Sequence, residues 1–273
     1  MTNYGVVIDV TKCIDCRVCV IQCKDEFAQN DYPPYSAAMP FRGQKWISVQ
    51  QVERGTFPMV KYSSVPILCQ QCDNAPCAAA ATGGAVYTTT DGIVLIDPTL
   101  GYGQSQLVAA CPYGVVFYNS DTATPQKCTL CIHRLESGRV PRCIQACSSS
   151  AIQIADMSVL NPIITANSAV QLHPEYGTQP KVYYIGLPMT FIAGSLVNQT
   201  TGDCVQGATV VATDSSGNKA GTATSDLLGN FFVDGLNSQT YTITVSLTGF
   251  TSQTIKGIVA SNNSLGDIQL TPT

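Results

Sequence analysis

The chain has 273 residues, which is enough for two domains of ordinary size. Charged residues make up only 12% of it, about half of the usual share, and the net charge is −4. A nucleic-acid partner therefore has no electrostatic support. The longest apolar candidate for a membrane span, residues 182–194, is short and broken by Pro188, so we expect no membrane span of its own.

The first ten residues lack the basic start and the long apolar core of a signal peptide. We therefore favour a cytoplasmic location. Placement on the extracytoplasmic face would require co-export with a partner that carries the signal.

Residues 4–10 are predicted to form a β-strand that leads into a tight cysteine run. That run is Cys13-x2-Cys16-x2-Cys19-x3-Cys23, the spacing of bacterial ferredoxins. In this arrangement the first three cysteines hold one [4Fe–4S] cluster and the fourth crosses to another. The insert at 26–66, rich in Pro, Tyr and Gln, is interpreted as a segment that covers a surface or contacts a partner.

A second run, Cys69-x2-Cys72-x4-Cys77, follows the insert. Residues 84–88 and 93–97 flank Asp91-Gly92, which predicts a β-hairpin. A helix is predicted over 104–110, ahead of Cys111, and a strand over 115–118.

A third run, Cys128-x2-Cys131-x11-Cys143-x3-Cys147, contains a predicted helix at 129–136 and precedes a strand at 151–154. The succession of strand, cysteine loop and helix is typical of a ferredoxin-like domain, and it occurs twice within residues 1–155.

The crossing rule assigns the twelve cysteines of this segment to three four-thiolate sites. The sets are Cys13, Cys16, Cys19 and Cys147 for cluster 1; Cys23, Cys128, Cys131 and Cys143 for cluster 2; and Cys69, Cys72, Cys77 and Cys111 for cluster 3. A fourth site would need cysteines at positions that hold Ala81, Gly101, Gln104 and Leu107. All four ligands are absent together, as expected if one whole cluster has been lost.

Zinc is the main alternative, because paired Cys-x2-Cys motifs often form structural zinc sites. Tetrahedral zinc has no use for the tight x2, x2, x3 run, and soft thiolates also suit iron–sulfur clusters. Disulfides fit less well, since cysteines so close along one loop are poorly placed for disulfide geometry.

Residues 156–189 contain four prolines and no clear periodicity, and we interpret them as an extended linker. From residue 190 to 273, short β-prone segments alternate with Gly and Asn turns, which predicts a small antiparallel sandwich. The predicted fold class is α+β, a duplicated bacterial ferredoxin-like domain followed by a small antiparallel β-sandwich.

A few single residues have two interpretations each. His133 could donate a hydrogen bond near a cluster or be an ordinary packed side chain. Lys127 and Arg142 adjoin predicted ligands, where their charge could raise a cluster potential, meet a partner or simply be solvated. Trp46 is interpreted as an anchor of the insert or of an interface. Cys204 stands alone in the sandwich, and the default for such a cysteine is a small buried hydrophobe.

The motifs of residues 1–155 resemble those of the iron–sulfur subunits of the dimethyl sulfoxide reductase superfamily of molybdopterin enzymes. The motifs that carry the likeness are Cys13 to Cys23, Cys69-Gln-Gln-Cys72-Asp-Asn-Ala-Pro-Cys77, Ala110-Cys-Pro-Tyr-Gly114, Gln126-Lys-Cys-Thr-Leu-Cys131 and Pro141-Arg-Cys143. Those subunits usually hold four clusters, and the loss of one is a departure.

Within that superfamily, small subunits of the transhydroxylase type are similar in having three clusters, the stretch from Gly84 to Pro98 and a C-terminal sandwich. The sandwich also resembles transthyretin-like or carboxypeptidase regulatory-like modules, through Gly207-Ala-Thr-Val, Gly229-Asn-Phe-Phe and Tyr241-Thr-Ile-Thr-Val.

The resemblance implies an electron-transfer subunit with three [4Fe–4S] clusters and no catalytic residue of its own. It also implies a large partner subunit that holds molybdopterin, with molybdenum or tungsten, together with the substrate site, in a heterodimer or a higher assembly. Two alternatives stay open, namely an independent multi-cluster carrier and an interaction module whose clusters are structural.

Overall fold

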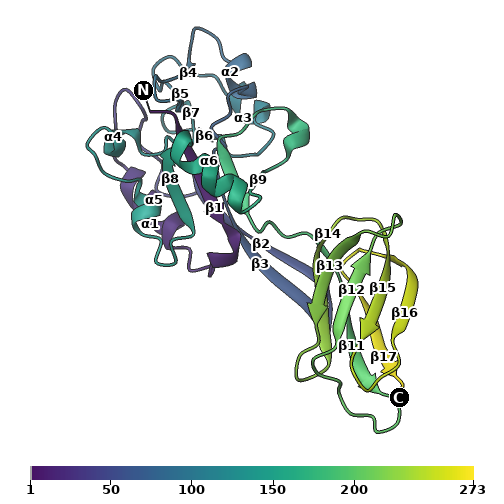
Figure 1. Ribbon diagram of the computed structural model, residues 1–273. Coiled ribbons are helices and arrows are strands. Elements are labelled where there is room, and N and C mark those ends of the chain that lie inside the picture. The colour runs from purple at the N-terminus through teal and green to yellow at the C-terminus, as the bar shows by residue number, and fades with distance from the viewer. Residues whose placement is uncertain (1) are drawn as a thin grey trace. The chain divides into compact units, whose positions relative to one another are not determined.

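The computed structural model describes residues 2–273, and within them the chain forms two compact units. The first comprises Met1–Gln51 and Ser64–Leu187, and the second comprises Val52–Ser63 and Pro188–Thr273. Figure 1 shows both units, with most of their elements labelled. Among residues 2–273, no helix is both long enough and apolar enough to cross a membrane.

The first unit combines short helices with short strands. Its helices are α1 (Val18–Phe27), α2 (Pro76–Ala79), α3 (Gln106–Ala110), α4 (Ile132–Leu135), α5 (Arg142–Gln145) and α6 (Met157–Ala166). Its strands are β1 (Tyr4–Asp9), β4 (Val86–Thr88), β5 (Val94–Ile96), β6 (Phe117–Asn119), β7 (Thr124–Gln126), β8 (Ile152–Asp156), β9 (Val170–Gln171) and β10 (Val182–Ile185). The hairpin of β2 (Ile47–Thr56) and β3 (Met59–Leu68) has residues in both units.

The first unit contains a four-stranded sheet in the order β8-β1-β10-β9, and α6 packs against β1 and β8. The predicted strands at 4–10 and 151–154 correspond to β1 and β8, which pair antiparallel. Ile8, Val182 and Tyr184 of this sheet are fully buried. The predicted hairpin around Asp91-Gly92 is present as β4 and β5.

The helix predicted over 129–136 is shorter in the structure, because α4 begins only at Ile132. Leu130 and Cys131 both have φ of 50°, a left-handed conformation that a helix cannot include. The short helix leaves Cys128 and Cys131 on a tightly turned loop.

The segment interpreted as an extended linker, 156–189, instead contains α6, β9 and β10, and it belongs to the first unit as far as Leu187. Asp156 caps α6 by accepting a hydrogen bond from the Ser158 amide at 2.8 Å. Val182 pairs in parallel with Val6 of β1, so this segment completes the sheet. The segment shows no periodic pattern in the sequence because α6 includes Pro162 and β9 has only two residues.

The second unit is a β-sandwich of two sheets. Its strands are β11 (Thr190–Asn198), β12 (Thr209–Thr213), β13 (Lys219–Thr224), β14 (Asn230–Leu236), β15 (Thr240–Ser246), β16 (Gln253–Val259) and β17 (Asn263–Leu270). The sheet orders are β14-β11-β17 and β13-β12-β15-β16, and all pairings are antiparallel except that of β11 with β17. Alternating residues such as Tyr241, Ile243 and Val245 point into the core.

Part of the predicted insert belongs to this second unit. Met59, from the hairpin, is buried against Phe191, Ala193 and Phe232. Asp234 of β14 forms an ion pair with Lys61 at 2.5 Å and another with Arg54 at 3.3 Å. The hairpin end therefore packs on the strands of the sandwich within this unit.

Candidate functional site

The first cysteine run begins where β1 ends. Asp9 accepts hydrogen bonds from the amide and the hydroxyl of Thr11 at 3.1 and 2.6 Å, which turns the chain after the strand. Asp15 and Arg17 then adopt left-handed φ values of 55° and 56° before α1 begins at Val18. Cys19 and Cys23 lie four residues apart on one buried face of α1.

The predicted set for cluster 1, here called group 1, gathers around the start of α1. Cys13, Cys147 and Cys16 all lie close enough to the Cys19 thiol to affect its acidity, although burial has the largest effect on it. Cys16 is exposed, and Cys13 and Cys147 are partly exposed. Group 1 is therefore the most accessible of the three sets.

The other two predicted sets line separate cavities. Group 2 is Cys23, Cys128, Cys131 and Cys143, and its cavity is walled by apolar side chains such as Phe27, Ile47, Leu68 and Ile152. Group 3 is Cys69, Cys72, Cys77 and Cys111, and its cavity also includes Val94, Val116 and Lys127. In residues 2–273, no three or more His, Cys, Asp or Glu side chains converge on a position for a single metal ion.

The three groups follow one another through shared neighbours. Cys19 of group 1 and Cys23 of group 2 lie on the same buried face of α1. Gln71, between Cys69 and Cys72 of group 3, donates a hydrogen bond to the carbonyl of Cys128 of group 2 at 3.1 Å. Group 2 therefore lies between the other two.

Burial governs the acidity of most of these thiols. It raises the pKa of Cys19 and Cys131 to about 11 and that of Cys72 and Cys128 to about 12. Cys147 is different: burial raises its pKa, but bonds from the Ser149 hydroxyl and nearby amides outweigh this and lower it. Cys19, Cys72, Cys128 and Cys131 therefore keep their protons near neutral pH until a metal replaces them.

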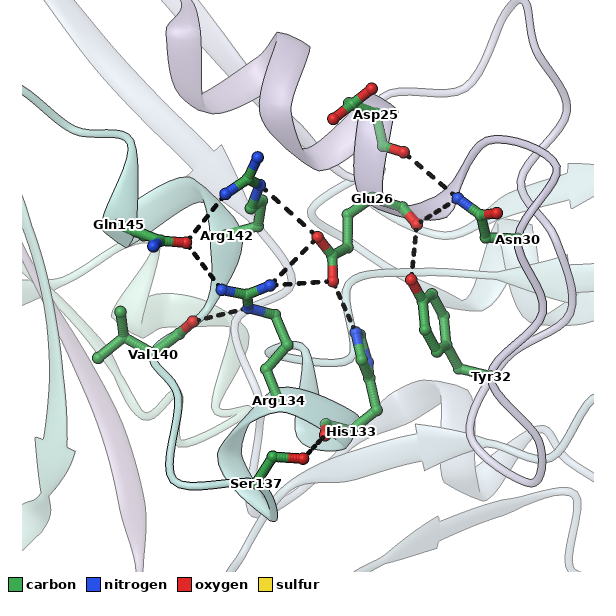
Figure 2. A network of polar contacts seen from close by, with 10 residues as sticks. All are labelled: Asp25, Glu26, Asn30, Tyr32, His133, Arg134, Ser137, Val140, Arg142 and Gln145. Carbon is green, nitrogen blue, oxygen red and sulfur yellow. Dashed lines mark hydrogen bonds and ion pairs between the residues drawn. The ribbon is translucent and has the colours of Figure 1, made fainter.

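Three helices next to group 2 meet at one carboxylate, shown in Figure 2. Glu26, on α1, accepts a hydrogen bond from His133 Nε2 at 3.0 Å and one from Arg134 Nη1 at 3.3 Å. Arg142 Nε lies 3.6 Å from its other oxygen. The carboxylate thus links α1, which carries Cys19 and Cys23, to α4 and α5.

Two uncharged side chains, Gln145 and Tyr32, contact the charged residues of this network. Gln145 Oε1 accepts from Arg134 Nη2 at 2.7 Å and from Arg142 Nη1 at 3.0 Å. The Tyr32 ring stacks on His133 with centroids 3.7 Å apart. Burial raises the pKa of Glu26, but the His133 bond and the Arg134 charge outweigh it and hold that pKa below its usual value.

The structure places the residues that had two interpretations as follows. His133 and Arg142 point to Glu26, as Figure 2 shows. Trp46 is buried, and its ring packs on Phe27 at 4.6 Å. Cys204 was expected to be buried, but it is exposed. Its β-bridge to Val197 lies outside the sandwich core.

Group 3 has polar neighbours from distant segments. Gln71 donates to the Cys128 carbonyl at 3.1 Å and accepts from the Val94 amide at 2.9 Å. The Thr178 hydroxyl hydrogen-bonds the Tyr113 hydroxyl at 2.5 Å, and the Thr178 carbonyl accepts from the amide of Asn74, in the loop between Cys72 and Cys77, at 3.1 Å. Burial lowers the pKa of Lys127, but Cys69, Cys77 and Cys128 in their ionised form outweigh burial and raise it.

The positions of the missing fourth site are filled by ordinary packing. Leu107 is fully buried in a cluster with Val86, Ile96 and Val116, and Ala81 packs against its edge. Gln104 accepts from the Thr82 amide at 2.9 Å and donates to the carbonyls of Thr82 and Leu100 at 3.0 and 2.8 Å.

Glu26, Arg134 and Thr178 escaped the sequence analysis. Glu26 had a usable signal, since a charged residue three positions after Cys23 is notable in a chain with 12% charged residues. Thr178 had none, because nothing in the sequence links residue 178 to a cysteine loop one hundred residues earlier.

Comparisons with known proteins agree with both halves of the chain. Residues 60–157 match the 4Fe-4S dicluster domain, and residues 192–271 match the carboxypeptidase regulatory-like domain. The predicted fold class is thereby confirmed: a ferredoxin-like iron–sulfur domain precedes a regulatory-like β-sandwich.

Several curated proteins are similar over most of the chain. The small subunit of pyrogallol hydroxytransferase from Pelobacter acidigallici is 36% identical over 258 residues, which cover 91% of this chain and 92% of that protein. A tetrathionate reductase subunit of Salmonella typhimurium is 35% identical, covering 70% of this chain and 75% of that protein. A protein of Halobacterium salinarum, named as a dimethyl sulfoxide reductase iron-sulfur subunit, is 34% identical, covering 70% and 81% respectively.

The fold and the cysteine groups therefore define an iron–sulfur protein of the electron-transfer class. More specifically, the chain belongs to the family of iron–sulfur subunits of the dimethyl sulfoxide reductase superfamily, which includes the small subunit of pyrogallol hydroxytransferase. The resemblance inferred from the cysteine motifs is confirmed.

Proposed function

We propose that the chain relays electrons through three [4Fe–4S] clusters, held by groups 1, 2 and 3, to or from a large catalytic subunit. The observation that carries this proposal is the succession of three four-cysteine groups with group 2 in the middle. Cysteine thiolates are the usual ligands of such clusters, and each bound cluster would supply one-electron redox chemistry.

The surroundings of the thiols suit this role. The walls of the group 2 and group 3 cavities are mostly apolar, so they exclude water from the ligands. The Glu26 network ties α1, which carries Cys23, and α5, which carries Cys143, to α4, which begins directly after Cys131. The chain itself supplies no acid, base or nucleophile to a substrate in this proposal.

Group 1 is the proposed point of contact with the partner. Cys16 is exposed and Ile14, between Cys13 and Cys16, is 67% exposed, so a cluster there would be only partly shielded by this chain. Ile21 on α1 is also exposed, at 62%. Apolar side chains left open around a redox centre fit a covered protein–protein contact.

The partner proposed is a large subunit that holds molybdopterin, with molybdenum or tungsten, and the substrate. The match to a small subunit named for pyrogallol hydroxytransferase extends over nearly the whole chain, sandwich included. Hydroxylated aromatic compounds are therefore the first substrate class to try. The sandwich, with the hairpin end that packs on it, is proposed as a docking or stabilising module.

Metal analysis of the native complex, purified without oxygen, tests the proposal. We expect about twelve irons per copy of this chain, from three four-iron clusters, and molybdenum or tungsten in a co-purifying large subunit. Iron without such a partner would support the independent carrier instead. Zinc in place of iron would contradict the proposed electron transfer, because zinc has no redox chemistry.

A ligand substitution sharpens this test. Cys111→Ser should remove or convert the group 3 cluster while the other two stay, as read from iron content and electron paramagnetic resonance. Cys204→Ser is the matched control, because this exposed cysteine lies in the sandwich, and it should leave about twelve irons. Equal iron loss in both variants would contradict the assignment.

A further inference from the structure

Lys127 is a buried cation between group 2 and group 3. It directly precedes Cys128 of group 2, and its side chain lines the group 3 cavity. Only 2% of the residue is exposed. Its Nζ donates to the carbonyl oxygens of Val94 and Cys128, the latter at 3.3 Å.

The ammonium group is held in place by its surroundings. Gln71 bonds the same two residues, accepting from the Val94 amide and donating to the Cys128 carbonyl. Lys127 therefore cannot turn toward solvent without breaking a buried polar arrangement.

No carboxylate among residues 2–273 lies within 4.0 Å of the Lys127 ammonium. Other buried cations in the first unit do have one: Lys181 Nζ lies 2.9 Å from Asp73, and Arg134 Nη1 lies 3.3 Å from Glu26. An isolated charge in a protein interior is strongly unfavourable unless an anionic group compensates it. The cysteines of both groups would supply that anionic charge as thiolates of bound clusters, because Cys69 and Cys77 line the same cavity as Lys127 and Cys128 follows it directly.

We propose that Lys127 is a shared counter-charge for the two clusters that the proposed function assigns to groups 2 and 3, and that it raises the reduction potentials of both. This inference rests on that proposed function. A fixed positive charge in a poorly solvated interior stabilises the extra electron on either neighbouring cluster. It also makes the midpoint potentials of the two clusters respond together to one substitution, while group 1 does not respond.

The chain contains a matched control for position. Lys12 precedes Cys13 as Lys127 precedes Cys128, so both stand directly before a Cys-x2-Cys pair. The Lys12 side chain is 52% exposed and pairs with Asp9 at 3.1 Å. Its charge is therefore neutralised and solvated, and its removal should have little effect on a cluster.

The test is a redox titration of the intact complex under exclusion of oxygen, followed by electron paramagnetic resonance. In Lys127→Met, two of three midpoint potentials should shift to more negative values, and the third should stay. Lys127→Arg, which keeps the charge, should leave all three midpoint potentials close to those of the wild type. Lys12→Met should leave all three potentials in place. Cys16→Ser, which alters one group 1 ligand, identifies the signal of that group.

Unchanged potentials in a Lys127→Met complex with full iron content overturn the inference, and so does an equal shift of all three. If Lys127→Met loses its clusters, Lys127→Gln keeps donors to the two carbonyls without the charge and takes over the test. Selective loss of about eight irons, from two clusters, supports a shared counter-charge, and loss of all iron contradicts it. A wild-type complex without redox-active iron would instead refute the proposed function itself.

Discussion

Restoring the four missing cysteines should not restore a fourth cluster. The change is the combination Ala81→Cys, Gly101→Cys, Gln104→Cys and Leu107→Cys. Each position matches the ligand spacing of a ferredoxin-type site, yet the structure fills the space between them with packed side chains. The iron content of the variant should therefore stay at about twelve per chain.

The loss of stability expected for the fourfold variant is the sum of three local effects. Leu107 is fully buried, and shortening it to Cys should cost about 1–3 kcal/mol of stability, somewhat less than a buried Leu→Ala change. Loss of the Gln104 side chain leaves the Thr82 amide without its partner, at about 1–3 kcal/mol. A Cβ on Gly101 would lie 2.8 Å from the Asp97 carbonyl oxygen, and such overpacking costs about 1–3 kcal/mol.

Together these effects approach about 3–9 kcal/mol, a large part of the stability of an ordinary domain. The assay compares iron and sulfide per chain with the temperature at which the visible absorbance of the clusters is lost. The single variant Ala81→Cys is the control, since it adds a thiol at a partly exposed position and should change neither quantity. About sixteen irons per chain and an additional cluster signal, with no loss of stability, would refute the reasoning.

Three further predictions concern the carboxylates and the group 1 surface. Glu26→Gln should destabilise the first unit by about 3–5 kcal/mol, because it leaves the buried Arg134 without a counter-charge, and faster cluster loss on heating is the measurement. The folded-state pKa of Glu26 is lowered, so its stabilising effect is present above the ordinary carboxyl pKa and is lost as the pH falls through the lowered value. The stabilities of wild type and Glu26→Gln should therefore converge in acid and differ near neutrality. A stability difference that does not change with pH would contradict this. Asp234→Asn should increase amide hydrogen exchange in the hairpin by removing its ion pair with Lys61, without changing iron content. Ile14→Glu should weaken association with the large subunit while leaving about twelve irons, and unaltered affinity by sedimentation or pull-down would exclude the proposed contact.

Local patterns in the sequence determined the chemistry and the coarse fold of this protein. The run from Cys13 to Cys23 encodes its own geometry, because a short turn and one helical turn suffice to place these thiols. The alternation in β15 and the Asp91-Gly92 turn likewise act over a few residues, so the sandwich and the hairpin were predictable. The family followed from the same local motifs.

The tertiary structure alone decided what surrounds the thiols. Glu26 meets His133 and Arg134 across more than one hundred residues, and Thr178 contacts the loop between Cys72 and Cys77 from a segment that showed no periodicity. Lys127 and Lys12 occupy equivalent places in the sequence, yet one is buried between two cysteine groups and the other is paired at the surface. Burial and charge compensation depend on which distant segments pack together, and cysteine spacing carries no information about that.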